Sequence, residues 1–363
     1  MKQTWKSSSL LVLLSMLLIV SFVGCTDEAE PEITPEPTPE VAETPVPEEI
    51  EEEEAEPMAG GMDIHGAIHR IAYGDNVVYL FGSLHGGRDA WYPLADAVED
   101  AMNWADIFVT EIGDVDMLGQ MAAIQEVAVL PDGQTWVEFL PEEAYDHMVA
   151  MAAAWGMNYE EVNTMNPAFI VMSLEMDILQ YLAEDLELGN TAGDISVDGY
   201  VMDRALARGI PIIGLETVEQ QVQILYNPPF EVIVARVMDL LPPDEMMETV
   251  QNSDEPGLDE LADMYEANDL VGLSDLFSDS ISLEAEEAAD NGLWIAYMRE
   301  TVMNWRSIYY ADEIARLLQE TEEPTTFFVV VGVSHIIRSL AGEEFTDIVE
   351  QLGLLGLDAA PIW

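Results

Sequence analysis

Cysteine and basic residues are both scarce in this sequence. The 363 residues include one cysteine, Cys25, so the chain forms no intrachain disulfide and no cysteine-based zinc cluster. Lysine and arginine together number 11, against 71 aspartate and glutamate residues, and the formal net charge at pH 7 is −60. A surface this acidic repels phosphate backbones, which argues against a nucleic-acid partner.

Several catalytic motifs are also missing. The sequence has no Gly-x-Ser-x-Gly elbow, no Walker-type phosphate loop and no His-Glu-x-x-His pair. Beyond the N-terminal region, no run of residues is long and apolar enough to cross a membrane. These absences argue against elbow-type serine hydrolases, P-loop nucleotide enzymes and helix-borne zinc peptidases.

The acidity belongs to the folded part of the chain as well as to its N-terminal tail. Only 14 of the 71 acidic residues lie between Cys25 and Met58. Counterions at high salt screen such self-repulsion, so we hypothesise a halophilic protein. The unfolding temperature is then expected to fall when molar salt is replaced by dilute buffer. Equal unfolding temperatures in the two solutions would contradict the hypothesis.

The N-terminus has the pattern of an export signal. Two lysines lie within Met1–Lys6, Leu10–Val23 is almost wholly apolar, and Phe22-Val23-Gly24-Cys25 follows. This pattern resembles a bacterial lipoprotein signal, with Phe22 where an aliphatic residue is usual. An uncleaved anchor is the alternative, but roughly fifteen apolar residues are short for a hydrocarbon core of ~30 Å. We predict a signal peptide over residues 1–24 and lipidation at Cys25, which anchors the exported protein to the outer face of the cell membrane. With its one cysteine lipidated, the protein is not a thiol enzyme.

Residues 25–61 form the predicted stalk between the lipid and the folded domain. The segment Thr26–Pro57 holds seven of the 19 prolines and almost no large apolar residues. It cannot bury a core, so we predict a disordered, extended stalk followed by one folded domain over residues 62–363.

The folded region reads as alternating strands and helices. Ile64–Tyr73 and Val77–Gly82 predict a hairpin around Gly74-Asp75-Asn76. A helix over Tyr92–Ala105 and a buried strand over Asp106–Thr110 then suggest a parallel crossover. Further along we predict helices over residues 115–188, a helix over Asp198–Arg208 with Asp198 as its N-cap, a strand over Ile210–Gly214, a helical insert over Phe230–Ala289, a long helix over Leu293–Gln319, a strand over Thr326–Val331, a helix over Glu343–Leu352 and an edge strand over Leu357–Ile362. The expected fold is a single α/β (α+β) domain with a central mixed sheet surrounded by helices.

Four polar side chains follow the predicted strands. His85 and His335 each come after an apolar run and a Gly-x-x step, while Glu111 and Glu216 follow two further strands. Open α/β sheets place their sites at the carboxyl ends of strands, and metal chemistry needs imidazoles and carboxylates that converge there. The simpler alternative is that each histidine is a satisfied loop residue.

The two carboxylates and one arginine raise the question of partners. A buried, unpaired carboxylate is costly, so Glu111 needs a metal, an arginine or a helix start. A helix N-terminal cap suits Glu216 better. Arg306 could hold a substrate carboxylate or carbonyl, or it could pair with one of the many acids. Of the remaining histidines, His65 and His69 lie on a predicted strand and His147 on an exposed helix.

Three blocks of the sequence resemble the TraB/GumN family, which shares motifs with the Tiki metalloproteases. They are VVYLFGSLHGGRDAWYPLADAVEDAMNWADIFVTEI, VDGYVMDRALARGIPIIGLETVEQQ, and NWRSIYYADEIARLL followed by FFVVVGVSHI. His85 and His335 match the family's two Gly-x-x-His histidines, Glu111 its acid and Arg306 its arginine. Ser307 stands where asparagine is usual, and Ser83 where threonine is usual.

The resemblance implies a Tiki/TraB/GumN-like fold and a metal-dependent hydrolase, most specifically a peptidase. In that reading His85, Glu111 and His335 bind a divalent ion, which mixed nitrogen and oxygen ligands allow to be zinc, manganese, cobalt or iron. Glu216 would take a proton from water and Arg306 would steady the substrate or an oxyanion. Which glutamate ligates and which acts as base stays open, as does the oligomeric state. The alternatives are a non-catalytic lipoprotein that binds a peptide, a metal or haem, and a structural surface protein.

Overall fold

The computed structural model describes residues 67–114, 117–185, 196–251, 258–289, 292–342 and 345–362. The predicted signal peptide, the lipidation site Cys25, the predicted stalk and His65 lie outside the described residues.

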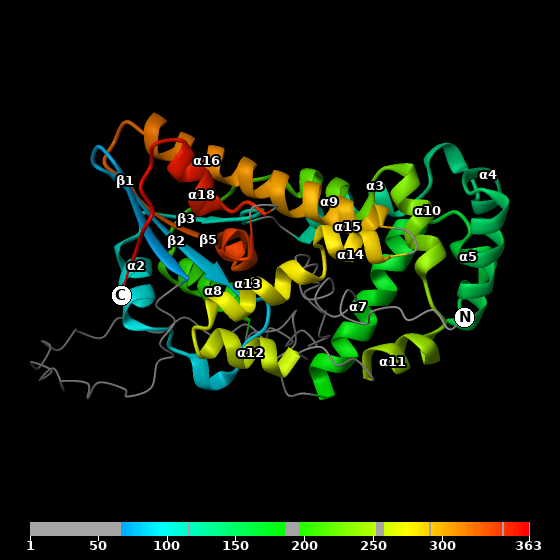
Figure 1. The fold of residues 1–363 in the computed structure, drawn as a ribbon. Coiled ribbons are helices and arrows are strands. Elements are labelled where there is room, and N and C mark those ends of the chain that lie inside the picture. The colour runs from blue at the N-terminus through cyan, green and yellow to red at the C-terminus, as the bar shows by residue number, and fades with distance from the viewer. Residues whose placement is uncertain are drawn as a thin grey trace, which may run out of the picture.

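A six-stranded mixed sheet forms one end of the molecule (Figure 1). Its strands are β1 (Ile68–Tyr73), β2 (Asn76–Ser83), β3 (Ile107–Thr110), β4 (Ile212–Gly214), β5 (Thr326–Gly332) and β6 (Ala360–Pro361), in the spatial order β4-β3-β5-β2-β1-β6. Strands β4, β3, β5 and β2 are mutually parallel, β1 forms the antiparallel hairpin with β2, and β6 pairs with β1. The predicted hairpin and the predicted edge strand near the C-terminus are both confirmed.

The centre of the sheet is buried on both faces. In β5 the five residues Phe327–Val331 are all buried, and β2 is buried at all but one of its eight positions. Parallel strands covered by helices on both sides read as continuous apolar runs, which is the pattern of these two segments. Because the four strands run parallel, the residues after them emerge at one edge of the sheet.

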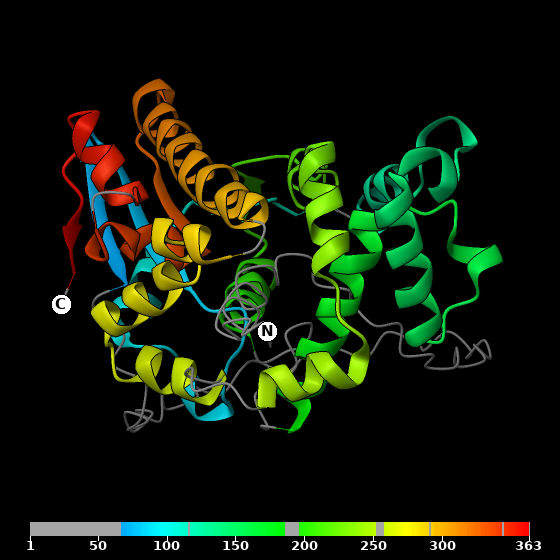
Figure 2. The ribbon, with the colours of Figure 1, turned by 45° about the vertical axis from the view of Figure 1, so that its right-hand side comes forward.

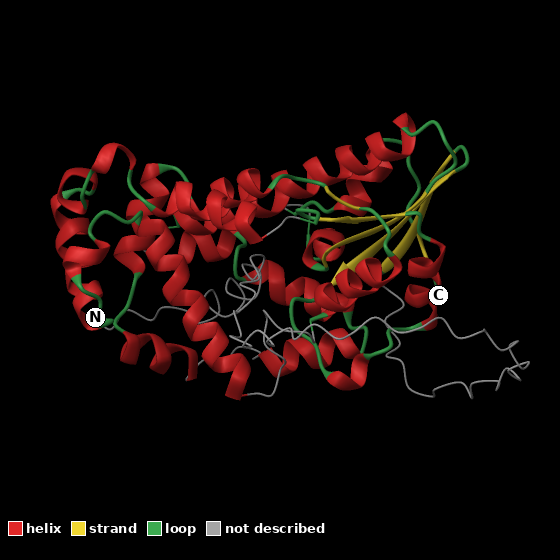
Figure 3. Cartoon of the chain, turned by 180° about the vertical axis from the view of Figure 1, so that it is seen from behind, coloured by secondary structure: helices red, strands yellow, loops and turns green. Residues whose placement is uncertain are grey.

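Helices make up most of the remaining chain (Figures 1 and 3). The α-helices are α2 (Asp96–Trp104), α3 (Met117–Ala128), α4 (Trp136–Phe139), α5 (Glu142–Ala154), α6 (Tyr159–Val162), α7 (Pro167–Asp185), α8 (Val197–Arg208), α9 (Val218–Tyr226), α10 (Phe230–Asp239), α11 (Pro243–Gln251), α12 (Leu258–Glu266), α13 (Leu270–Asp279), α14 (Leu283–Ala288), α15 (Leu293–Tyr297), α16 (Arg306–Glu320), α17 (Ser334–Ile337) and α18 (Ile348–Leu354). Short 3₁₀ turns are η1 (Asp89–Trp91), η2 (Pro131–Gly133) and η4 (Arg338–Leu340), and the π-helix η3 spans Met298–Trp305. No helix in the described part of the chain is long and apolar enough to cross a membrane.

Two apolar clusters fill the interior of this single α/β domain. The larger lies around the sheet, where α16 contacts β1 and β2 (Figure 1). The smaller joins α5, α7 and α10 at the other end of the molecule, away from the strands (Figure 2). The predicted insert over Phe230–Ala289 is helical, but it does not form one unit. Its helix α11 packs in the smaller cluster, whereas α12 and α13 pack in the larger one.

Several predicted details differ from the structure. The helix predicted over Glu343–Leu352 begins at Ile348, and the strand predicted over Ile210–Gly214 begins at Ile212. The helix predicted from Tyr92 begins at Asp96, because the preceding residues form the 3₁₀ turn η1 and an extended link. The N-cap of α8 is Ser196 and not Asp198, since the Ser196 hydroxyl accepts the hydrogen bond from Gly199 N at 3.0 Å. The predicted long helix is helical from Leu293 to Glu320, with eight residues of π-helix in its middle.

Candidate active site

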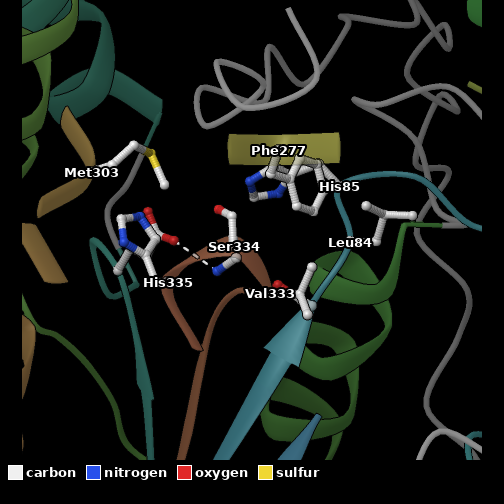
Figure 4. A pocket seen from close by; sticks show the side chains of 10 residues that line it. Leu84, His85, Phe277, Met303, Val333, Ser334 and His335 are labelled. Atoms are coloured by element: carbon white, nitrogen blue, oxygen red, sulfur yellow. Dashed lines mark hydrogen bonds between the residues drawn. The ribbon is translucent and has the colours of Figure 1, made fainter. Parts of the chain in front are cut away.

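Three of the predicted site residues line one small pocket at the carboxyl edge of the sheet (Figure 4). His85 follows β2, Glu111 directly follows β3, and His335 lies in α17 just after β5. Because β3, β5 and β2 are neighbours in the sheet, their ends deliver these side chains to the same place. The other residues that line the pocket are Ser83, Leu84, Phe277, Met303, Gly332, Val333 and Ser334.

The His85 imidazole is held by an aspartate from α8. Its Nδ1 lies 2.7 Å from Asp198 Oδ2, and the Ser83 hydroxyl donates to Asp198 Oδ1 at 2.6 Å. Burial disfavours the imidazolium, but the adjacent Asp198 carboxylate outweighs burial and raises the pKa of His85 to about 9. The side chain is 17% exposed, so it borders both the pocket and solvent.

The His335 imidazole is buried and anchored through its Nδ1 as well. That nitrogen lies 2.9 Å from Ser307 Oγ, and the Tyr310 ring meets the imidazole edge-on at 5.3 Å. Burial lowers the pKa of His335 to about 3, and the nearby charge of Arg306 adds to the lowering. Ser307 thus supplies the hydrogen-bonding partner of this buried histidine.

Glu111 is bound on both of its carboxylate oxygens. Oε1 accepts from Gly332 N at 3.0 Å, and Oε2 accepts from Arg306 Nη2 at 2.8 Å. The Tyr310 hydroxyl also lies 3.3 Å from Oε2. Burial opposes ionisation, yet the Arg306 charge holds the pKa of Glu111 at about 2, so the group is a carboxylate at neutral pH.

Glu216 and Arg306 lie behind Glu111 and are not among the pocket-lining residues. The Arg306 side chain is 0% exposed and its Nη2 donates to Glu216 Oε1 at 2.6 Å. The Tyr310 hydroxyl donates to the same oxygen at 2.7 Å, and Gln221 Nε2 does so at 3.1 Å. Arg306 therefore pairs with two buried acids, and its contacts support Glu111 from behind. The catalytic roles of Glu216 and Arg306 stay predictions.

The close approach of the backbone after β3 to the end of β4 explains why Glu111 and Glu216 lie together. Gly113 has φ +73°, and a Cβ there would lie 2.7 Å from Gly214 N, so the two backbones pass in contact. This close approach lets Glu216 N donate to Glu111 O at 2.8 Å. Two glycines thus bring the two carboxylates to adjacent positions.

The pocket offers the donor types that a divalent ion takes. A Cβ built on Gly332 would lie 3.7 Å from Glu111 Oε1, 3.9 Å from His85 Nε2 and 3.9 Å from His335 Cδ2, so all three side chains face one point. Both imidazoles are held through Nδ1, the arrangement that metal-binding histidines favour. As they stand, no three His, Cys, Asp or Glu side chains among the described residues are close enough to hold an ion. The donor types, two imidazoles and a carboxylate, fit a divalent ion.

Two residues of this site were missed in the sequence. Asp198 was predicted as a helix cap, although the neighbouring Ser196 could fill that role and leave the carboxylate free. Tyr310 follows Arg306 by four residues, a spacing that puts both side chains on one face of α16. The other described histidines lie apart from the pocket: His69 is on β1, and His147 Nε2 hydrogen-bonds Leu240 O at 2.9 Å.

Comparison with known proteins gives one match. The model of the TraB/PrgY/gumN family matches residues 67–340, a range that includes His85, Glu111, Asp198, Glu216, Arg306 and His335. No curated protein matches the chain, and no solved structure does.

Proposed function

The chain belongs to the TraB/PrgY/gumN family, and from that membership we propose that it is a metal-dependent hydrolase, most specifically a peptidase acting on extracellular peptides or proteins. One observation supports the proposal above the others. His85 and His335 line the same pocket as Glu111, and each imidazole is anchored through Nδ1 by a partner.

In this proposal His85, His335 and Glu111 hold a divalent ion: zinc, manganese, cobalt or iron. When bound, the ion lowers the pKa of a water and polarises a carbonyl of the substrate. Mixed imidazole and carboxylate ligands suit all four metals, so the donor set alone selects none of them.

Hydrogen bonds from Arg306 and from the backbone of Gly332 keep Glu111 ionised and in place. Arg306 Nη2 bonds to Glu111 Oε2, while Gly332 N bonds to Oε1. Glu111 is the one carboxylate among the described residues that line the pocket, so it either ligates the ion or takes a proton from water. The Glu216 carboxylate contacts Arg306, Tyr310 and Gln221 and does not line the pocket, which suits a supporting role.

The remaining wall of the pocket is apolar. Leu84, Phe277, Met303 and Val333 line it beside the polar groups, and Phe277 comes from the helical insert. Apolar walls exclude water and strengthen electrostatic interactions within the site. We further propose that the domain acts outside the cell, tethered by a lipid on Cys25 and held off the membrane by the stalk.

The metal requirement is tested on the purified domain, residues 62–363. We expect it to retain close to one equivalent of zinc, manganese, cobalt or iron, and a chelator to remove both the metal and the cleavage of a peptide library. His335→Ala should lower the metal content, because it removes an anchored imidazole. His147→Ala is the matched control, since that histidine lies away from the pocket.

Glu111→Gln separates the two roles of the carboxylate. If Glu111 is the base, the variant keeps its metal and loses cleavage; if it is a ligand, the variant loses both. If the wild-type protein retains no metal after exposure to all four ions, the proposal of a metal-dependent hydrolase is wrong. Metal retention without cleavage of any library member would favour the binding lipoprotein instead.

A further inference from the structure

Both carboxylate oxygens of Asp198 have hydrogen-bonding partners at the edge of the pocket. Oδ1 accepts from the Ser83 hydroxyl at 2.6 Å, and Oδ2 lies 2.7 Å from His85 Nδ1. Both partners belong to the end of β2 or the turn after it, whereas Asp198 is 113 residues further along the chain. These contacts connect α8 to the pocket.

Helix α8 holds Asp198 in a fixed position. Ser196 caps the helix, so the Asp198 carboxylate is not needed for the first backbone N–H groups. Further along α8, the Tyr200 hydroxyl and Arg204 both bond to Glu99 of α2, at 2.5 Å and 2.6 Å. The helix therefore has its own attachment to the domain and does not depend on His85 for its position.

The contact with Asp198 determines which nitrogen of His85 faces the pocket. With Nδ1 directed at the carboxylate, Nε2 points the other way, to 3.9 Å from the place of a Cβ on Gly332. The same point is approached by Glu111 Oε1 at 3.7 Å. Without Asp198 the imidazole could rotate and turn either nitrogen to the pocket.

We propose that Asp198 is a positioning residue: it holds the His85 ring with Nε2 towards the pocket, and Ser83 in turn orients the Asp198 carboxylate. The inference rests on the proposed function, in which His85 binds the ion. In metal sites generally, removing the group that holds a histidine ligand weakens metal binding by about 10–100-fold. The Ser83 hydroxyl donates to Asp198 Oδ1 and the other Asp198 oxygen contacts His85 Nδ1, so in this proposal both residues act through His85.

The test compares Asp198→Asn with Asp203→Asn in the purified domain. Asp203 is exposed on the same helix, so the control makes the same change of charge without contact to His85. Titration calorimetry with Zn²⁺ and Mn²⁺ should give a dissociation constant about 10–100-fold higher for Asp198→Asn. The control should bind as the wild type does. Ser83→Ala, which leaves the aspartate in place, should weaken binding in the same direction but less.

A second measurement needs no metal. In the metal-free protein, the His85 ring nitrogens are observed by NMR and assigned by the loss of their signals in His85→Ala. We expect a strongly downfield, exchange-protected Nδ1 proton in the wild type and in Asp203→Asn. That signal should be lost or broadened in Asp198→Asn.

The two measurements distinguish a failure of this inference from a failure of the proposed function. If the wild type binds neither ion, the metal-dependent function fails, while the NMR signal still decides whether Asp198 holds the ring. If Asp198→Asn keeps both the wild-type affinity and the wild-type His85 signals, the positioning role is overturned. Should Asp198→Asn not fold, the wild type decides: the absence of the downfield Nδ1 proton from the wild-type spectrum overturns the positioning role of Asp198. Wild-type affinity and wild-type His85 signals in Ser83→Ala overturn the orienting role of Ser83.

Discussion

Replacing Arg306 with methionine is expected to lower the free energy of unfolding by about 3–5 kcal/mol. The guanidinium is 0% exposed, and it pairs with two carboxylates whose side chains are 9% and 1% exposed, Glu111 and Glu216. Methionine fills a similar volume but carries no charge and donates no hydrogen bond. Two acids would then be buried without their cation, and that is a large penalty.

Urea unfolding of the wild type and of two variants checks this expectation. Arg316→Met is the matched control, because Arg316 is half exposed and pairs with Glu313 on the surface of the same helix. Surface pairs of this kind contribute about 0.3–0.5 kcal/mol. Equal losses in the two variants would show that Arg306 is not the cation that stabilises the buried acids. Because Arg306 fixes Glu111, the variant should also lose whatever activity the pocket has.

Gly332→Ala is expected to lower the rate of hydrolysis by about a hundredfold or more, with little change in the stability of the fold. The added methyl group would stand 3.7–3.9 Å from Glu111 Oε1, His85 Nε2 and His335 Cδ2, which are ordinary contact distances. Gly332 lies at the end of strand β5 and has no positive φ, so alanine introduces no backbone strain there. The methyl would occupy the point that Glu111 Oε1, His85 Nε2 and the His335 ring all border, and would keep out an ion or a water.

The measurement pairs peptide cleavage and metal content with a thermal unfolding curve. Gly353→Ala on α18 serves as the control, since its methyl would meet no atom within 4 Å. Both variants should unfold close to the wild type, and only Gly332→Ala should lose metal and cleavage. A fully active Gly332→Ala protein would mean that the chemistry happens somewhere other than this point.

Much of the fold was predictable because buried parallel strands leave a strong local pattern. The runs ending at Ser83 and Gly332 are almost wholly apolar, and each becomes a central strand buried on both faces. His85, Glu111 and His335 could be placed at one edge of the sheet because parallel strands end together. The first residue of a helix was harder to predict. The N-cap is whichever of two nearby polar side chains accepts a hydrogen bond from the first backbone N–H groups, and in α8 this is Ser196 and not Asp198.

The sequence by itself determined the strands, their direction and the three residues at their ends, because apolar periodicity and the crossover rule act locally along the chain. Only the tertiary structure decided what each polar group faces. In the folded chain Arg306 is buried and pairs with Glu111 and Glu216, and Asp198 contacts His85 although the two are 113 residues apart in the sequence. Such pairings follow from the packing of α16 and α8 on the sheet. Their energies depend on burial and distance, and neither quantity is encoded in the spacing of residues along the chain.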